Sequence, residues 1–114
     1  DACIKKKISM RAGETDIAMI VNKKKYFNLA KYISSKTKHI GNLDCDAIED
    51  KKKNIYFFDF NLRFGGGYAF THSAGYNFLK SLIFLMKGKK IKLNSKKQKM
   101  IFSKGISVHK NYGK

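Results

Sequence analysis

Three polar residues alternate with aromatic ones in the segment YFFDFNLRFGGGYAF, residues 56–70. Side chains two positions apart on a strand share a face, so Asp59 and Asn61 are expected to point the same way. Arg63 joins them if the strand continues. We expect Phe58 and Phe60 to point to the other side, into the core. A strand that served only to pack a core would not need the three polar groups.

A second set of acids precedes this segment. In NLDCDAI, residues 42–48, Asp44 and Asp46 alternate with small and apolar residues. A turn near 50–53 would make a hairpin of the two strands and bring Asp46 close to Asp59. Two carboxylates and an amide oxygen are hard ligands that suit Mg²⁺ when phosphate oxygens and water complete the shell. The alternation is also typical of a solvated strand face.

The residues after the second strand fit the same chemistry. Arg63 has the planar fork that binds phosphate or the charge of an acyl phosphate. Three glycines, Gly65, Gly66 and Gly67, would let the backbone come close to a second substrate. A flexible turn is the other interpretation of this glycine run.

The rest of the chain predicts a small α+β domain. Hydrophobic spacing and turn residues indicate two hairpins, two helices and two weaker strands in the tail. We expect one antiparallel sheet with two flanking helices, in a single domain over 1–114. The expected elements are a hairpin of 2–10 and 17–22, a helix over 24–41 that stops at Gly41, the hairpin 42–61, a helix over 74–88, and the strands KMIFSKG and ISVHKNY.

The charge of +17 suggests a polyanion as partner, but the basic residues argue against specific recognition. Of the 25 basic residues, 23 are Lys and two are Arg, whereas sequence readers rely on the bidentate fork of Arg. We therefore expect no specific nucleic-acid partner, although non-specific binding at low salt would follow. The aromatic residues around 56–64 are expected in the core rather than on a base-stacking surface.

The spacing of the cysteines and the length of the apolar runs limit further which classes of protein are possible. Cys3 and Cys45 are far apart and lack metal-ligand spacing, which predicts two reduced thiols. No apolar run reaches the length of a membrane-spanning helix. We expect a cytoplasmic protein that does not bind a membrane.

The order of the motifs resembles the C-terminal part of ATP-grasp enzymes, above all the ligases similar to the large subunit of carbamoyl-phosphate synthase. The resemblance covers roughly residues 4–90 and runs from KKKISMRAGETDIAMIV through GNLDCD and FDFNLRFGGGY to AGYNFLKSLIFLMKG. It implies an enzyme that uses ATP with Mg²⁺ or Mn²⁺ to convert a small carboxylate into an acyl phosphate, which an amine captures.

The resemblance also implies roles for single residues. Asp46, Asp59 and Asn61 would hold the metal ion, and Asp59 stands where the family has Glu. Asn61, Arg63 and Arg11 would bind the nucleotide, with Arg63 as the catalytic residue on the transferring phosphoryl group. The substrate site would be formed by Gly65, Gly66, Gly67 and His72.

Two of these assignments have an equally simple structural interpretation. Arg11 could be a turn arginine, and His72 could belong to a helix start with Thr71 or Ser73 as the N-cap. The usual Pro of the family's motif is Leu62 here, which removes stiffness from the loop.

The family's fold also includes a small upstream lobe that covers the nucleotide. We expect this chain to be the C-terminal portion of the domain, without its N-terminal lobe, to be completed by that lobe or by a partner chain, and not to turn over alone. An exposed hydrophobic face at the docking position would predict a homodimer. The alternative function is a non-catalytic basic module that binds polyanions or a partner protein.

Overall fold

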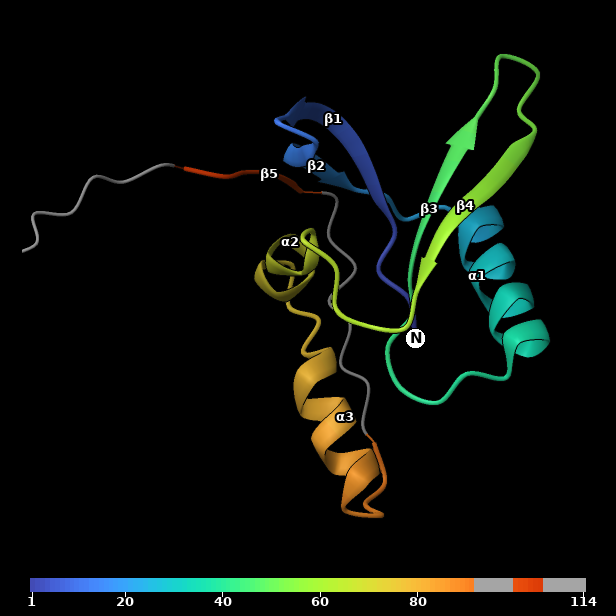
Figure 1. Ribbon diagram of the computed structural model, residues 1–114, viewed down its shortest axis with the longest axis vertical. Coiled ribbons are helices and arrows are strands. Elements are labelled where there is room, and N and C mark those ends of the chain that lie inside the picture. The colour runs from blue at the N-terminus through green and yellow to red at the C-terminus, as the bar shows by residue number, and fades with distance from the viewer. Residues whose placement is uncertain (92–99, 106–114) are drawn as a thin grey trace, which may run out of the picture.

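The computed structural model describes residues 1–91 and 100–105 and shows an α+β arrangement of two antiparallel sheets and three helices (Figure 1). The expected fold class is therefore confirmed in general terms, but the single sheet and the pair of helices were wrong. In chain order the elements are β1 (Lys5–Arg11), β2 (Glu14–Ile20), α1 (Lys24–Thr37), β3 (Asp44–Glu49), β4 (Ile55–Asn61), α2 (Tyr68–Ser73), α3 (Phe78–Met86) and β5 (Ile101–Ser103).

The first sheet has the strand order β1-β2-β5. The hairpin of β1 and β2 turns at Ala12 and Gly13, which both have positive φ. β5 pairs antiparallel with β2, with Ala18 opposite Phe102. The predicted first hairpin and the strand in KMIFSKG are thus confirmed, and the expected strand in ISVHKNY lies outside the described residues.

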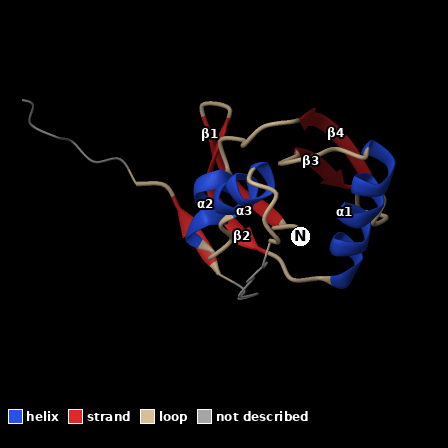
Figure 2. Ribbon diagram, turned by 90° about the horizontal axis from the view of Figure 1, so that it is seen from below, coloured by secondary structure: helices blue, strands red, loops and turns tan. Residues whose placement is uncertain are grey.

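The second sheet is the hairpin of β3 and β4, and α1 lies along it in both views (Figures 1 and 2). Glu49 at the end of β3 connects the two elements, since it accepts hydrogen bonds from Tyr26 Oη and from Lys25 Nζ. These donors, Tyr26 first, lower the pKa of Glu49 to about 2. The helix ends at Thr37 because Lys38 adopts the left-handed conformation that terminates helices, so the expected stop at Gly41 was wrong.

The region after β4 holds two helices where one was expected. α2 occupies 68–73, so His72 lies in its last turn and is not at a helix start. α3 begins only at Phe78, and its N-cap is Asn77, whose side chain accepts a hydrogen bond from the Lys80 N–H at 3.0 Å. Asn is one of the strongest N-cap residues, and the proposed caps Thr71 and Ser73 were wrong.

The hydrophobic core lies between the first sheet and the chain from α2 to α3. Ile20, Ala74 and Tyr76 are buried there, with Cys3, Phe78 and Phe102 packed against them. Cys3 and Cys45 are both free thiols. The core thus forms around β2, and the aromatic strand β4 does not contribute to it.

Apolar side chains of α3 share one face, as predicted, but that face is exposed. Leu79 and Ile83 are about half exposed, and Met86 is 79% exposed. None of the helices in the described ranges is long and apolar enough to cross a membrane.

Candidate functional site

The hairpin of β3 and β4 contains an irregularity at Asp59. Cys45 pairs with Phe60, whereas Asp46 pairs with Phe58, so Asp59 is an extra residue in β4. Its φ of 53° is left-handed, a conformation that Asp and Asn adopt more readily than other non-glycine residues. This is a β-bulge, and bulges commonly redirect side chains next to functional sites.

The bulge changes which residues share a face. Cross-strand partners lie on the same face, so Asp44 lies with Asn61, and Asp46 lies with Phe58. Phe60 is on the opposite face, where its ring centroid lies 6.5 Å from that of Phe57. The prediction that Phe58 and Phe60 point together into the core was therefore wrong, and both rings are nearly half exposed.

Asp59 and Asn61 do lie together, as predicted. The Asn61 side-chain amide donates to Asp59 Oδ1 at 2.9 Å. Asn61 is directly opposite Asp44 in the ladder. The end of the hairpin thus presents two carboxylates and an amide at neighbouring positions.

The thiol of Cys45 on β3 lies within the electrostatic influence of three acids. Burial raises the pKa of this thiol, and the charges of Asp46, Asp44 and Asp59 raise it further. Asp44, Asp46 and Asp59 lie toward the end of the hairpin at which β3 begins and β4 ends.

Asp46 is held by a different partner. Its carboxylate accepts a hydrogen bond from Lys7 Nζ on β1 at 2.5 Å. This ion pair joins the two sheets. Asp44 is free of such a pair among the described residues and lies against the glycine run, because a Cβ atom on Gly65 would come within 1.8 Å of Asp44 Oδ2. Asp44 was not predicted to be a ligand, although its alternation with Asp46 in the sequence placed both on one face.

Arg63 lies just beyond β4 and does not contact the acids. It is exposed, its guanidinium donates to the Phe64 carbonyl at 3.3 Å, and its own carbonyl accepts from Asn42 Nδ2. His72 is also exposed, and its ring lies 6.0 Å from that of Tyr68. Neither side chain is brought to Asp59 and Asn61 by a hydrogen bond or ion pair of the described residues.

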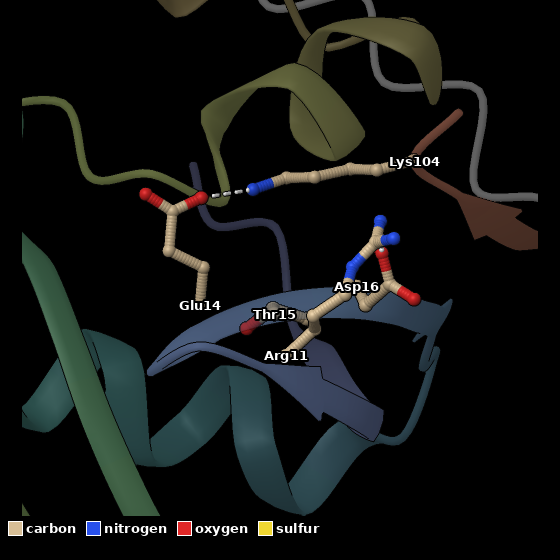
Figure 3. Close-up of a pocket in the computed structure, with 5 residues that line it drawn as sticks. All are labelled: Arg11, Glu14, Thr15, Asp16 and Lys104. Carbon is tan, nitrogen blue, oxygen red and sulfur yellow. Dashed lines mark hydrogen bonds and ion pairs between the residues drawn. The ribbon is translucent and has the colours of Figure 1, made fainter. Parts of the chain in front are cut away.

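Arg11 belongs to a small pocket at the turn of the first hairpin. Figure 3 shows its guanidinium against Asp16, with an N–O distance of 2.5 Å, while Lys104 Nζ lies 2.6 Å from Glu14. The pocket is lined by these four residues and Thr15. Because each cation already has a carboxylate, this arrangement favours a structural role for Arg11.

Lys5 on β1, which was not predicted to be a site residue, reaches the glycine run. Lys5 Nζ donates to the Gly67 carbonyl at 3.2 Å and to Thr71 Oγ1 at 3.0 Å. Nothing in the sequence separates Lys5 from its neighbours in a lysine run, so only the fold identifies it.

The described side chains of this region do not form a metal site by themselves. Within the described ranges, no three His, Cys, Asp or Glu side chains form a group that could hold a metal ion. Two carboxylates with an amide oxygen can still hold Mg²⁺ when phosphate oxygens and water supply the other ligands. No protein-family model matches the chain, and no curated protein sequence is significantly similar to it.

Proposed function

We propose that this chain is the C-terminal, nucleotide-binding portion of an ATP-grasp ligase that joins a carboxylate to an amine. The observation that carries the proposal is the pair of Asp59 and Asn61, hydrogen-bonded to each other at the end of β4. They stand in a motif order that resembles the metal-binding strand of that family. Asp44 faces Asn61 across the ladder, and the glycine run follows directly.

The donor set fits a magnesium ion shared with a nucleotide. Asn61 uses its amide nitrogen toward Asp59, which leaves its carbonyl oxygen available as a ligand. Asp59, Asn61 and Asp44 would hold the ion, and Asp46 would join them if Lys7 released it. When bound, Mg²⁺ would neutralise charge on the nucleotide phosphates.

The proposed chemistry has two steps. An oxygen of the substrate carboxylate attacks the γ-phosphorus of ATP, and the bond from that phosphorus to the β–γ bridging oxygen breaks, which yields an acyl phosphate and ADP. A neutral amine then adds to the acyl carbon, phosphate leaves with the electrons of the C–O bond, and the amine proton passes to water. Catalysis of this kind consists mainly of positioning and charge stabilisation.

Within this scheme, Arg63 binds the transferring phosphoryl group. Its side chain is exposed and makes one weak contact with a backbone carbonyl, so it is free to turn toward a phosphate. A further lobe or a partner chain would cover the nucleotide, and a cytoplasmic location, where ATP is available, belongs to the same proposal.

Calorimetry with ADP and Mg²⁺ at moderate salt tests the proposal. The test variant is Asp59→Ala with Asn61→Ala. The control is Asp50→Ala with Asn54→Ala, which removes the same groups from the other end of the hairpin, where Asn54 Nδ2 also donates to an Asp carboxylate at 2.9 Å. We expect metal-dependent binding by the wild type and the control and its loss in the test variant. Equal binding by all three would refute the site.

A second candidate function is binding of polyanions without sequence preference. The observation that favours it is the exposure of Tyr56 (59%) and Phe58 (45%) on β4 of a chain with a charge of +17. Exposed rings on a basic surface can stack on unpaired bases. Affinity for a single-stranded oligonucleotide that falls steeply with salt, and falls again in Tyr56→Ala, would support this candidate.

A further inference from the structure

An open groove lies between α1 and the start of β4. Its volume is about 600 Å³, within the range of about 300–1,000 Å³ that is typical of small-molecule sites. The residues that line it are Lys25, Asn28, Leu29, Tyr32, Lys53 and Ile55. The four that belong to α1 are spaced at intervals of three and four residues and therefore share one face of the helix. The groove lies at the opposite end of β4 from Asn61.

Three of the lining side chains are apolar or aromatic. Leu29 and Ile55 are half-buried, and Tyr32 is 59% exposed. A ligand chain or ring placed on these side chains would remove apolar surface from water. Each methylene that becomes fully buried favours binding about fourfold, so the groove suits a ligand with an apolar body.

The charged part of the lining is cationic. Lys25 Nζ lies 3.0 Å and Lys53 Nζ lies 3.4 Å from the two carboxylate oxygens of Glu49, so two ammonium groups share one acid. Lys36 Nζ adds a further cation, 5.5 Å from the ring centroid of Tyr32. None of the described residues that line the groove is acidic. Because positive charge exceeds negative charge here, the groove favours an anion.

The two lining cations are held in place by their own surroundings. Lys25 Nζ lies 4.8 Å from the ring centroid of Tyr26. Lys53 has a left-handed backbone, with a φ of 70°, in the turn between β3 and β4. The Asn54 N–H and its side-chain amide both donate to the Asp50 carboxylate and fix this turn. Groups that are already ordered lose less conformational entropy when a ligand binds.

We propose that the groove between α1 and β4 binds a small amphipathic carboxylate, a molecule with an apolar chain or ring and one negative charge. The apolar part would lie on Leu29, Tyr32 and Ile55. The carboxylate would accept the ammonium N–H groups of Lys25 and Lys53 that Glu49 does not use. The lined part of α1 is only about 10 Å long at 1.5 Å per residue, which suits a small molecule better than a peptide helix. The proposal does not depend on the proposed nucleotide site.

Titration with octanoate, below its micellar concentration, tests the groove by methyl NMR signals. Those of Leu29 and Ile55 should move and saturate in the wild type. Those of Ile48, on the opposite face of the hairpin, and of Met86, 79% exposed on α3, should not move. Affinity should rise about two- to fourfold with each methylene from butanoate to octanoate. Octylammonium, with the same chain and the opposite charge, should bind at least about fivefold more weakly.

Two matched pairs of variants test the lining side chains. Tyr32→Ala should weaken octanoate binding about fivefold, whereas Tyr56→Ala, which removes an equally exposed ring from the other face of the hairpin, should change it by less than about twofold. Lys53→Met should weaken binding about three- to fivefold, and Lys52→Met, in the same turn, by less than about twofold. All four side chains are exposed, so each variant is expected to fold.

The proposal would be overturned if the signals of Leu29 and Ile55 did not move. Equal movement of the Met86 signal would assign the attraction to any exposed apolar surface, and equal binding of octylammonium or equal effects of the two lysine variants would refute the role of Lys53. Shifts of the groove signals on dilution of the free protein would assign the groove to a second copy of the chain. A response to an acidic, leucine-containing peptide but not to octanoate would assign it to a protein partner.

Discussion

The left-handed backbone of Asp59 predicts an unusual order of stability among substitutions at this position. At an ordinary strand position, Gly is less stable than Ala by about 0.5–1 kcal/mol, because Gly loses more conformational entropy on folding. At a φ of 53° the order should reverse. Asp59→Gly should be more stable than Asp59→Ala, although both lose the hydrogen bond with Asn61.

The size of the reversal can be worked out from two terms. A side chain in the left-handed region costs about 1–2 kcal/mol, a strain that Ala carries and Gly does not. The entropic disadvantage of Gly, about 0.5–1 kcal/mol, opposes this. The net preference for Gly lies between about 0 and 1.5 kcal/mol, with a midpoint of about 0.75 kcal/mol. Asp59→Asn, which tolerates the same backbone, should stay close to the wild type.

Urea unfolding followed by circular dichroism gives the free energies of unfolding. Ile48, exposed on β3 of the same hairpin and without positive φ, provides the matched control. There Ile48→Ala should be more stable than Ile48→Gly by about 0.5–1 kcal/mol. If Ala proved more stable than Gly at both positions, the bulge at Asp59 and the face assignment built on it would be refuted.

Two further predictions concern single side chains. Gly65→Ala should force the Asp44 carboxylate away from the loop and lower the free energy of unfolding in urea by about 1 kcal/mol. The control Gly66→Ala, where the added methyl group lies in open space, should change this free energy by less than about 0.5 kcal/mol. Equal effects of the two substitutions would contradict the close approach of Asp44 to Gly65. Glu49, whose pKa is lowered to about 2, contributes stability that is fully present above its ordinary pKa of 4.5 and is lost as the pH falls through about 2. The free energy of unfolding should therefore fall less steeply with decreasing pH in Glu49→Gln than in the wild type. An identical pH dependence in both proteins would show that the Tyr26 hydrogen bond does not stabilise the fold.

Local patterns in the sequence were sufficient to predict the two hairpins and α1. The helical spacing of Tyr26, Leu29 and Ile33 matches the half-buried side of α1. Alternation in 44–49 and 55–61 matches the strands β3 and β4. These elements are determined by residues close together in the sequence, so the local pattern is sufficient to predict them.

The predictions were wrong where a single residue, or the pairing of two segments distant in the sequence, determines the structure. A strict alternation along β4 cannot show that Asp59 is an extra residue, so the faces of Phe58 and Phe60 were misassigned. α2 has only six residues and directly follows three glycines, so its hydrophobic pattern is too short to predict a helix. The separation into two sheets depends on β2 pairing with β5 rather than with the second hairpin, a choice between distant segments.

Of the candidate site, the pair of Asp59 and Asn61 was predictable, whereas Asp44 and the nearby cation Lys5 were not. Asp59 and Asn61 were found from spacing, and their contact is observed. Asp46 was predicted as a metal ligand too, but in the structure it is paired with Lys7, a contact between two hairpins that has no local signature in the sequence. Lys5 was missed for the same reason, since its partners lie 62 and 66 residues away.

The pairing of β2 with β5 has a consequence for how the chain folds during synthesis. Ile17 to Met19 pair with Ile101 to Ser103, and Phe102 packs against the core around Ile20. The ribosome must therefore extend the chain beyond residue 103 before this edge of β2 is covered. Until then, the unpaired strand edge can bond to other chains, and such non-local closure is slow. The lysine-rich composition keeps nascent chains apart by charge repulsion during this interval.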